Sequence, residues 1–133
     1  MASSELKEMV KGKACFISGP MTGIEHYNVS AFAEAHAILK ECGAKRIYDP
    51  AILWLQERND VSEQMTHEDY MAKCLHELTR DSYMGERAYD VLVQIDSWHQ
   101  SDGAWREYLV ATCCGIECLE LANYQQDEGG DQQ

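Results

Sequence analysis

The sequence predicts an α/β fold in which a parallel sheet of four to five strands is flanked by helices. Short apolar runs typical of strands occur at residues 13–18, 45–48, 89–95 and 116–121. Segments with helical spacing of apolar residues separate these runs, and strands that alternate with helices favour a parallel sheet. The 133 residues contain no internal repeat, so we expect one domain with a modest hydrophobic core.

The first predicted strand leads into a loop that suits close contact with a ligand. Residues 1–12 are expected to form a short helical lead-in, and the apolar run at 13–18 stops at Gly19-Pro20. The loop 19–23 contains two glycines and a proline, which let the backbone approach a ligand closely. Its spacing matches neither a P-loop nor a G-x-G-x-x-G fingerprint, so ATP or NAD chemistry is not predicted.

The next two helices are predicted from their capping signals and apolar spacing. Asn28 or Ser30 can cap the first, which ends at Gly43 and has an apolar face formed by Phe32, Ala35, Ile38, Leu39 and Cys42. Thr66 and Asp69 mark the start of the second, whose apolar face contains Met71, Cys74, Leu75 and Leu78. Residues 51–64 are expected to form an ordinary packed loop, a lid or a subunit contact.

The C-terminal part of the chain adds a loop, an edge strand and a tail. Residues 79–87 are polar and contain Gly85, so the preceding helix is expected to break within them. Apolar and acidic residues alternate over 116–121, which is typical of an edge strand with one solvated face. Residues 125–133 are acidic and predicted to be disordered, so the folded domain is expected to span 13–124.

A carboxylate in an apolar helix stripe is the most unusual feature of the sequence. Residues 104–114 are predicted to form a helix that stops at Gly115, with Ser101 and Gly103 in the loop before it. On a helical wheel Glu107 falls inside the apolar arc formed by Ala104, Tyr108, Val110, Ala111 and Cys114. Glu107 is therefore either a functional carboxylate, or one that extends to the helix edge or pairs with Arg106 or Lys73.

Composition excludes several classes of partner. The chain has 23 acidic and 11 basic residues and a net charge of −12, which disfavours binding to nucleic-acid polymers or anionic membranes. We find neither a signal-peptide pattern nor a stretch of membrane-spanning length. None of the six cysteines forms a C-x-x-C pair, so we expect free thiols in a reducing cytoplasm and predict neither a metal site nor a cofactor.

Three stretches of the chain form one combined pattern, namely residues 16–23 with Tyr27-Asn28, residues 69–71, and Ser97-Trp98 followed by 101–104 and Glu107. Together they resemble the nucleoside 2-deoxyribosyltransferase superfamily, in particular a small bacterial and phage branch. The resemblance implies a flavodoxin-like Rossmann variant that forms homodimers or higher homo-oligomers with shared active sites. It also implies cleavage of the N-glycosidic bond of nucleosides or nucleotides, by hydrolysis or by transfer to another base, with Glu107 as the nucleophile.

The same resemblance implies a set of substrate-binding residues. They are Gly19, Pro20, Met21, Ser101, Gly103 and Ala104. Members specific for nucleosides tend to carry Asp at the position of Ser101, whereas nucleotide hydrolases carry Ser, which accommodates a 5′-phosphate. Electrostatics supports this distinction, because a carboxylate would repel the phosphate that a hydroxyl and helix N–H groups would bind.

Two departures from the family pattern bear on catalysis. Relatives usually have Tyr at the position of Phe16, and Asp at the position of Cys74, where it is a candidate for positioning or protonating the base. Asp69 or Glu77 could substitute for that aspartate. Two functions therefore follow from the sequence: a nucleotide or nucleoside N-glycosidase acting through Glu107, and a nucleotide-binding or sensing module with weak or no catalysis on the same fold.

Overall fold

Four parallel strands form the sheet of the protein. The computed structural model describes residues 3–21, 28–52, 67–82 and 85–124. The strands are β1 (Ala14–Ser18), β2 (Arg46–Tyr48), β3 (Val91–Gln94) and β4 (Glu117–Glu120). Their order in the sheet is β2-β1-β3-β4, and every pairing is parallel. The four predicted strands are thus confirmed, although each is shorter than its apolar run.

The strand order creates a crevice at one edge of the sheet. From β1 the chain moves outward to β2 on one side, whereas from β3 it moves outward to β4 on the other. This order is consistent with the predicted flavodoxin-like Rossmann variant. In such open sheets ligands bind at the carboxyl ends of the strands where the direction of winding reverses, here between β1 and β3.

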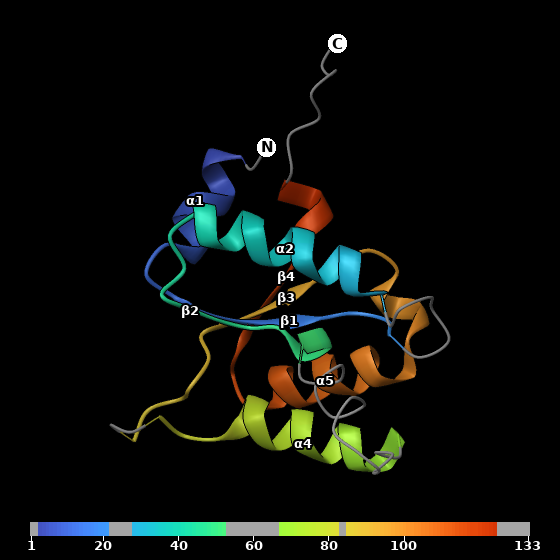
Figure 1. The fold of residues 1–133 in the computed structure, drawn as a ribbon. Coiled ribbons are helices and arrows are strands. Elements are labelled where there is room, and N and C mark those ends of the chain that lie inside the picture. Colours follow the sequence, from blue (N-terminus) through green and yellow to red (C-terminus); the bar gives the residue numbers. More distant parts are fainter. Residues whose placement is uncertain (1–2, 22–27, 53–66, 83–84, 125–133) are drawn as a thin grey trace.

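Helices cover both faces of the sheet (Figure 1). On one face lie α1 (Ser4–Val10) and α2 (Val29–Glu41), and on the other lie α4 (His67–Thr79) and α5 (Asp102–Cys113). The short helices η2 (Trp98–Gln100) and η3 (Leu121–Tyr124) follow β3 and β4. Among the described residues, no helix is long and apolar enough to cross a membrane.

The core extends into the predicted N-terminal lead-in. Ser3 caps α1 by accepting a hydrogen bond from the Leu6 amide at 3.1 Å, and its own amide donates to the Tyr124 carbonyl at 3.1 Å. Leu6 and Val10 are completely buried in the same core as the strands. Residues 3–10 therefore pack as part of the folded domain, which we expected to span only 13–124.

The burial of each strand explains the residue pattern of its sequence. All five residues of β1 and all four of β3 are buried, as expected for central strands covered by helices on both faces. In β4, Glu117 and Glu120 are exposed while Leu119 is buried, which confirms the predicted edge strand. Of the segment 51–64, predicted to be a loop, a lid or a subunit contact, residues 51–52 are helical, and residues 53–64 lie outside the described residues, as does the predicted tail at 125–133.

Candidate active site

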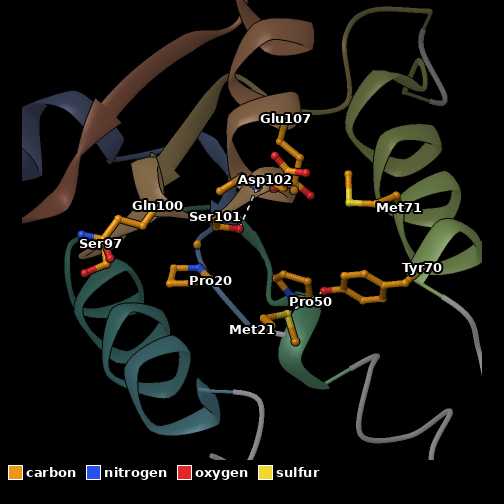
Figure 2. Close-up of a pocket in the computed structure, with 13 residues that line it drawn as sticks. Pro20, Met21, Pro50, Tyr70, Met71, Ser97, Gln100, Ser101, Asp102 and Glu107 are labelled. Carbon is orange, nitrogen blue, oxygen red and sulfur yellow. Dashed lines mark hydrogen bonds between the residues drawn. The ribbon is translucent and has the colours of Figure 1, made fainter. Parts of the chain in front are cut away.

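A cavity of about 510 Å³ lies at the carboxyl ends of β1 and β3, beside the start of α5 (Figure 2). All the residues singled out from the sequence line it, namely Gly19, Pro20, Met21, Ser101, Gly103, Ala104 and Glu107. The structure adds six that we did not assign to the site, namely Pro50, Tyr70, Met71, Ser97, Gln100 and Asp102. Of these, Tyr70, Met71, Ser97 and Asp102 lie in the stretches that carry the resemblance, whereas Pro50 and Gln100 lie outside them.

The loop after β1 is held close to the sheet by two contacts. A Cβ atom on Gly19 would lie 2.2 Å from Cγ1 of the buried Ile95, so any larger residue would collide with it. The side-chain amide of Asn28 donates to the Pro20 carbonyl at 2.9 Å. Asn28 is the N-cap of α2, one of the two predicted positions, whereas Ser30 lies inside the helix. Asn28 has a left-handed φ of 62° and makes no side-chain cap hydrogen bond, so its side chain fixes the loop instead.

The N-terminus of α5 forms the wall opposite this loop. Ser101 is the N-cap, as predicted, and its Oγ accepts a hydrogen bond from the Ala104 amide at 3.1 Å. The helix therefore begins at Asp102, two residues earlier than the sequence indicated. A Cβ atom on Gly103 would lie 3.0 Å from Met71 Sδ, so the missing side chain allows α4 and α5 to approach each other at the cavity.

Glu107 reaches the cavity from the second turn of α5. Its side chain is buried, with 5% of the residue exposed, and its Oε1 accepts a hydrogen bond from Ser18 Oγ at 2.6 Å. Arg106 instead pairs with Asp102 across one helical turn at 3.4 Å. The alternatives in which Glu107 extends to the surface or pairs with Arg106 are therefore wrong.

Burial shifts the protonation of this carboxyl group. Loss of solvent raises the pKa of Glu107 from 4.5 to about 7, and the hydrogen bond from Ser18 opposes that rise. Near neutral pH the group thus exists in both forms. Carboxyl groups in clefts with a pKa so far from its ordinary value are candidates for function.

A phenyl ring and a thiol occupy the two positions where the family pattern is broken. Phe16 stacks on Tyr48 at a centroid distance of 4.8 Å, and Ser18, two residues along on the same face of β1, donates the hydroxyl that reaches Glu107. Cys74 is completely buried beside Tyr70 and Tyr48. Burial, together with nearby Glu107, raises the pKa of this thiol to about 12, so it stays protonated.

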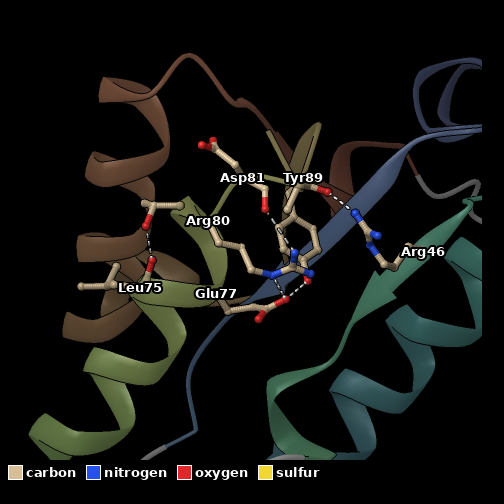
Figure 3. A network of polar contacts seen from close by, with 8 residues as sticks. Arg46, Leu75, Glu77, Arg80, Asp81 and Tyr89 are labelled. Atoms are coloured by element: carbon tan, nitrogen blue, oxygen red, sulfur yellow. Dashed lines mark hydrogen bonds and ion pairs between the residues drawn. The ribbon is translucent and has the colours of Figure 1, made fainter. Parts of the chain in front are cut away.

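Neither proposed substitute for the missing aspartate reaches the cavity. The Glu77 carboxylate accepts a hydrogen bond from Arg80 Nε at 3.0 Å and another from the Tyr89 hydroxyl (Figure 3). This network lies at the opposite end of α4 from Tyr70 and fixes the polar segment that follows the helix. Asp69 is exposed and is not among the residues that line the cavity.

The described residues that line the cavity include negatively charged side chains but no positively charged ones. Asp102 and Glu107 are its acidic residues, and none of the described lining residues is Lys, Arg or His. An anionic group bound here would therefore rely on the N–H groups at the start of α5. In the part of the chain that the structure describes, no cluster of three or more His, Cys, Asp or Glu residues could hold a metal ion.

Fold and site together define an α/β protein with a buried carboxylate at the switch point of a parallel sheet. Comparison with protein families places it more specifically. The chain belongs to the DUF4406 family, described as a domain of unknown function, whose model matches residues 13–120. Searches of curated proteins and of solved structures found no match.

Proposed function

We propose that the protein cleaves the N-glycosidic bond of a (deoxy)nucleoside or its 5′-monophosphate, by hydrolysis or by transfer to another base. The observation that carries this proposal is Glu107, a carboxylate buried at the cavity with one oxygen held by Ser18. The resemblance of the sequence to the nucleoside 2-deoxyribosyltransferase superfamily supports the same reaction, because its nucleophilic glutamate corresponds to Glu107.

In the proposed reaction, the free oxygen of Glu107 attacks the anomeric carbon as the bond to the base nitrogen breaks. The electron pair of that bond leaves with the base, which takes up a proton, and a glycosyl ester forms on Glu107. Water or a second base then attacks the same carbon and gives up a proton to solvent, and the ester bond breaks to release the carboxylate. Glu107 must be ionised to attack, so the pKa of about 7 predicts a rate that rises with pH to a plateau above neutrality.

The cavity offers groups for the rest of such a substrate. Its volume of about 510 Å³ falls in the usual range for small-molecule sites. Met21, Tyr70 and Met71 form an apolar side that suits a heterocyclic base, whereas Ser101 and the start of α5 suit a hydroxyl or phosphate at the other end of the sugar. Figure 2 shows these two groups of side chains on different sides of the space below Glu107.

A binding module is the second candidate function, and Cys74 is the observation that favours it. A protonated thiol, enclosed by Tyr48 and Tyr70, stands where relatives carry the aspartate that can position or protonate the base. Without that group the leaving base must obtain its proton from water. A protein with this site could retain nucleotide binding while its turnover is slow or absent.

One experiment separates these functions. The protein is incubated with a panel of nucleosides and 5′-monophosphates, and free base is measured by chromatography while the melting temperature is recorded in parallel. Base release from one class of substrate supports the enzyme. Thermal stabilisation by a nucleotide without base release supports the binding module, and neither effect with any member of the panel contradicts both.

We also propose that the protein forms homodimers or higher homo-oligomers. Trp105 and Leu109 on α5 are 41% and 54% exposed, which is unusual for large apolar side chains. Trp105 adjoins Trp98 and Tyr108, with ring centroids 5.1 and 5.5 Å from its own. This aromatic surface lies on the helix that carries Glu107, so a second copy bound there would lie near the cavity.

A further inference from the structure

We propose that Ser18 is a positioning residue for Glu107, holding Oε1 so that Oε2 is the oxygen presented to the cavity. The hydroxyl of Ser18 donates to Oε1 at 2.6 Å, and both side chains are buried. The inference rests on the proposed function for what Oε2 reacts with. The contact itself, and its effect on the protonation of Glu107, can be tested without any substrate.

The position of the Ser18 hydroxyl is fixed by the sheet. Ser18 is the last residue of β1, is completely buried, and pairs in register with Gln94 of β3. Its carbonyl accepts a hydrogen bond from the Ile95 amide at 3.0 Å. Since β1 is a central strand, this hydroxyl has little freedom to move, and it defines where one oxygen of Glu107 lies.

The second oxygen of Glu107 is left for the cavity. The structure gives Oε2 no hydrogen-bond partner among the described residues, and Glu107 is one of the residues that line the cavity. Figure 2 shows its side chain directed from α5 toward the space between Ser101 and Met71. A buried carboxylate with one satisfied oxygen and one open oxygen is oriented for attack by the open one.

Among the described residues, Ser18 is the hydrogen-bond donor to the Glu107 carboxylate. On α4, Tyr70 and Cys74 face Glu107 with pKa values raised by burial, so both remain neutral. On α5, Asp102 lines the same cavity and adds negative charge. A serine hydroxyl has one proton to donate, and donation to a carboxylate stabilises its ionised form. Removing the hydroxyl should therefore favour the protonated form of Glu107.

The test is a carbon-13 NMR titration of Glu107 in protein labelled at the glutamate side-chain carboxyl. The Glu107→Gln variant identifies the resonance by its absence. In the wild type we expect a midpoint near 7, and in Ser18→Ala a midpoint higher by about one to two pH units, the usual worth of a hydrogen bond to a charged group. Ser18→Thr keeps the hydroxyl and should restore a midpoint close to that of the wild type.

A second variant and a control complete the design. Ser18→Cys replaces the hydroxyl with a weaker donor of similar shape, so its midpoint should also rise, and it carries the test if the alanine variant does not fold. Ser101→Ala removes a hydroxyl that lines the cavity without touching Glu107, and should leave the midpoint unchanged. A midpoint in Ser18→Ala or Ser18→Cys equal to that of the wild type would overturn the proposal.

The titration also separates this inference from the proposed function. If no nucleoside or nucleotide releases its base, the proposed function fails, but a raised midpoint in Ser18→Ala still establishes the control of Glu107 by Ser18. If base is released, the pH at which kcat is half-maximal should rise in Ser18→Ala by the same amount as the NMR midpoint. A purely structural role for Ser18 would lower stability without moving either pH value.

Discussion

Replacing Glu107 with Gln should stabilise the folded protein at neutral and alkaline pH. The pKa of Glu107 is raised by burial from 4.5 to about 7, so the folded state binds this proton more tightly than the unfolded state. The stability that the protonated group contributes is complete below pH 4.5, is lost as the pH rises toward 7, and does not change further above it. The wild type therefore carries a buried charge at pH 8 that the Glu107→Gln variant lacks.

The structure sets the size of this effect. A change in pKa from 4.5 to about 7 corresponds to a loss of about 3 kcal/mol in the free energy of unfolding once the group is ionised. Because the side chain is buried, solvent screening does not reduce this figure appreciably. Glutamine has nearly the same shape and can still accept the hydrogen bond from Ser18, so packing should be retained.

Urea unfolding of both proteins between pH 5.5 and 8.5 measures their free energies of unfolding and so tests the prediction. The stability of Glu107→Gln relative to the wild type should increase by about 2 kcal/mol across this range, with most of the change below pH 7. Glu120→Gln, which removes an exposed carboxylate from β4, should follow the wild type. A constant difference between wild type and Glu107→Gln would refute the argument that burial raises the pKa of Glu107.

Three further predictions concern the loop, the phosphate and the assembly. Gly19→Ala should destabilise the protein by about 1–3 kcal/mol because its Cβ meets Ile95, and in thermal or urea unfolding the double variant with Ile95→Ala should lose less than the sum of the single changes. Calorimetry should show a 5′-monophosphate binding more tightly than its nucleoside by about 1–3 kcal/mol, and Ser101→Asp, which can still cap α5, should remove that preference; equal affinities in the wild type would exclude a phosphate site there. Sedimentation should show an assembly larger than 15.1 kDa at micromolar concentration, which Trp105→Glu should weaken, whereas a single 15.1 kDa species would contradict the proposed oligomer.

The sheet could be predicted from the sequence because its signals are local. Runs such as 13–18 and 89–95 are apolar and bounded by turn residues, and parallel pairing requires both faces to be buried. The strand ends were less exact, since the end residues of an apolar run can be buried without joining the sheet. Tyr89 illustrates this, because it is buried but precedes the first residue of β3.

From the residues themselves, a site residue could be predicted only where an unusual residue type occurs at a recognisable place in one helix or loop. Glu107 stood out because a carboxylate in an apolar stripe is rare, and Ser101 because it precedes a helix. Ser18 and Tyr70 lie in stretches that carry the resemblance, but neither was assigned to the site, since a serine at a strand end and a tyrosine on a helix are common. Their roles follow from distances between β1, α4 and α5 that only the fold supplies. Asn28 carried a capping signal, but its side chain bonds to Pro20 instead.

Base release by the wild type and by Glu107→Gln, measured at pH 8 with the best substrate of the panel, tests the central claim most directly. At this pH the wild-type carboxylate is ionised, and the variant is expected to be folded and to bind the substrate. We predict that Glu107→Gln lowers the rate by several orders of magnitude, because a neutral amide cannot form the glycosyl ester, while Glu120→Gln leaves it unchanged. Base release by Glu107→Gln at the wild-type rate would contradict the assignment of Glu107 as the nucleophile.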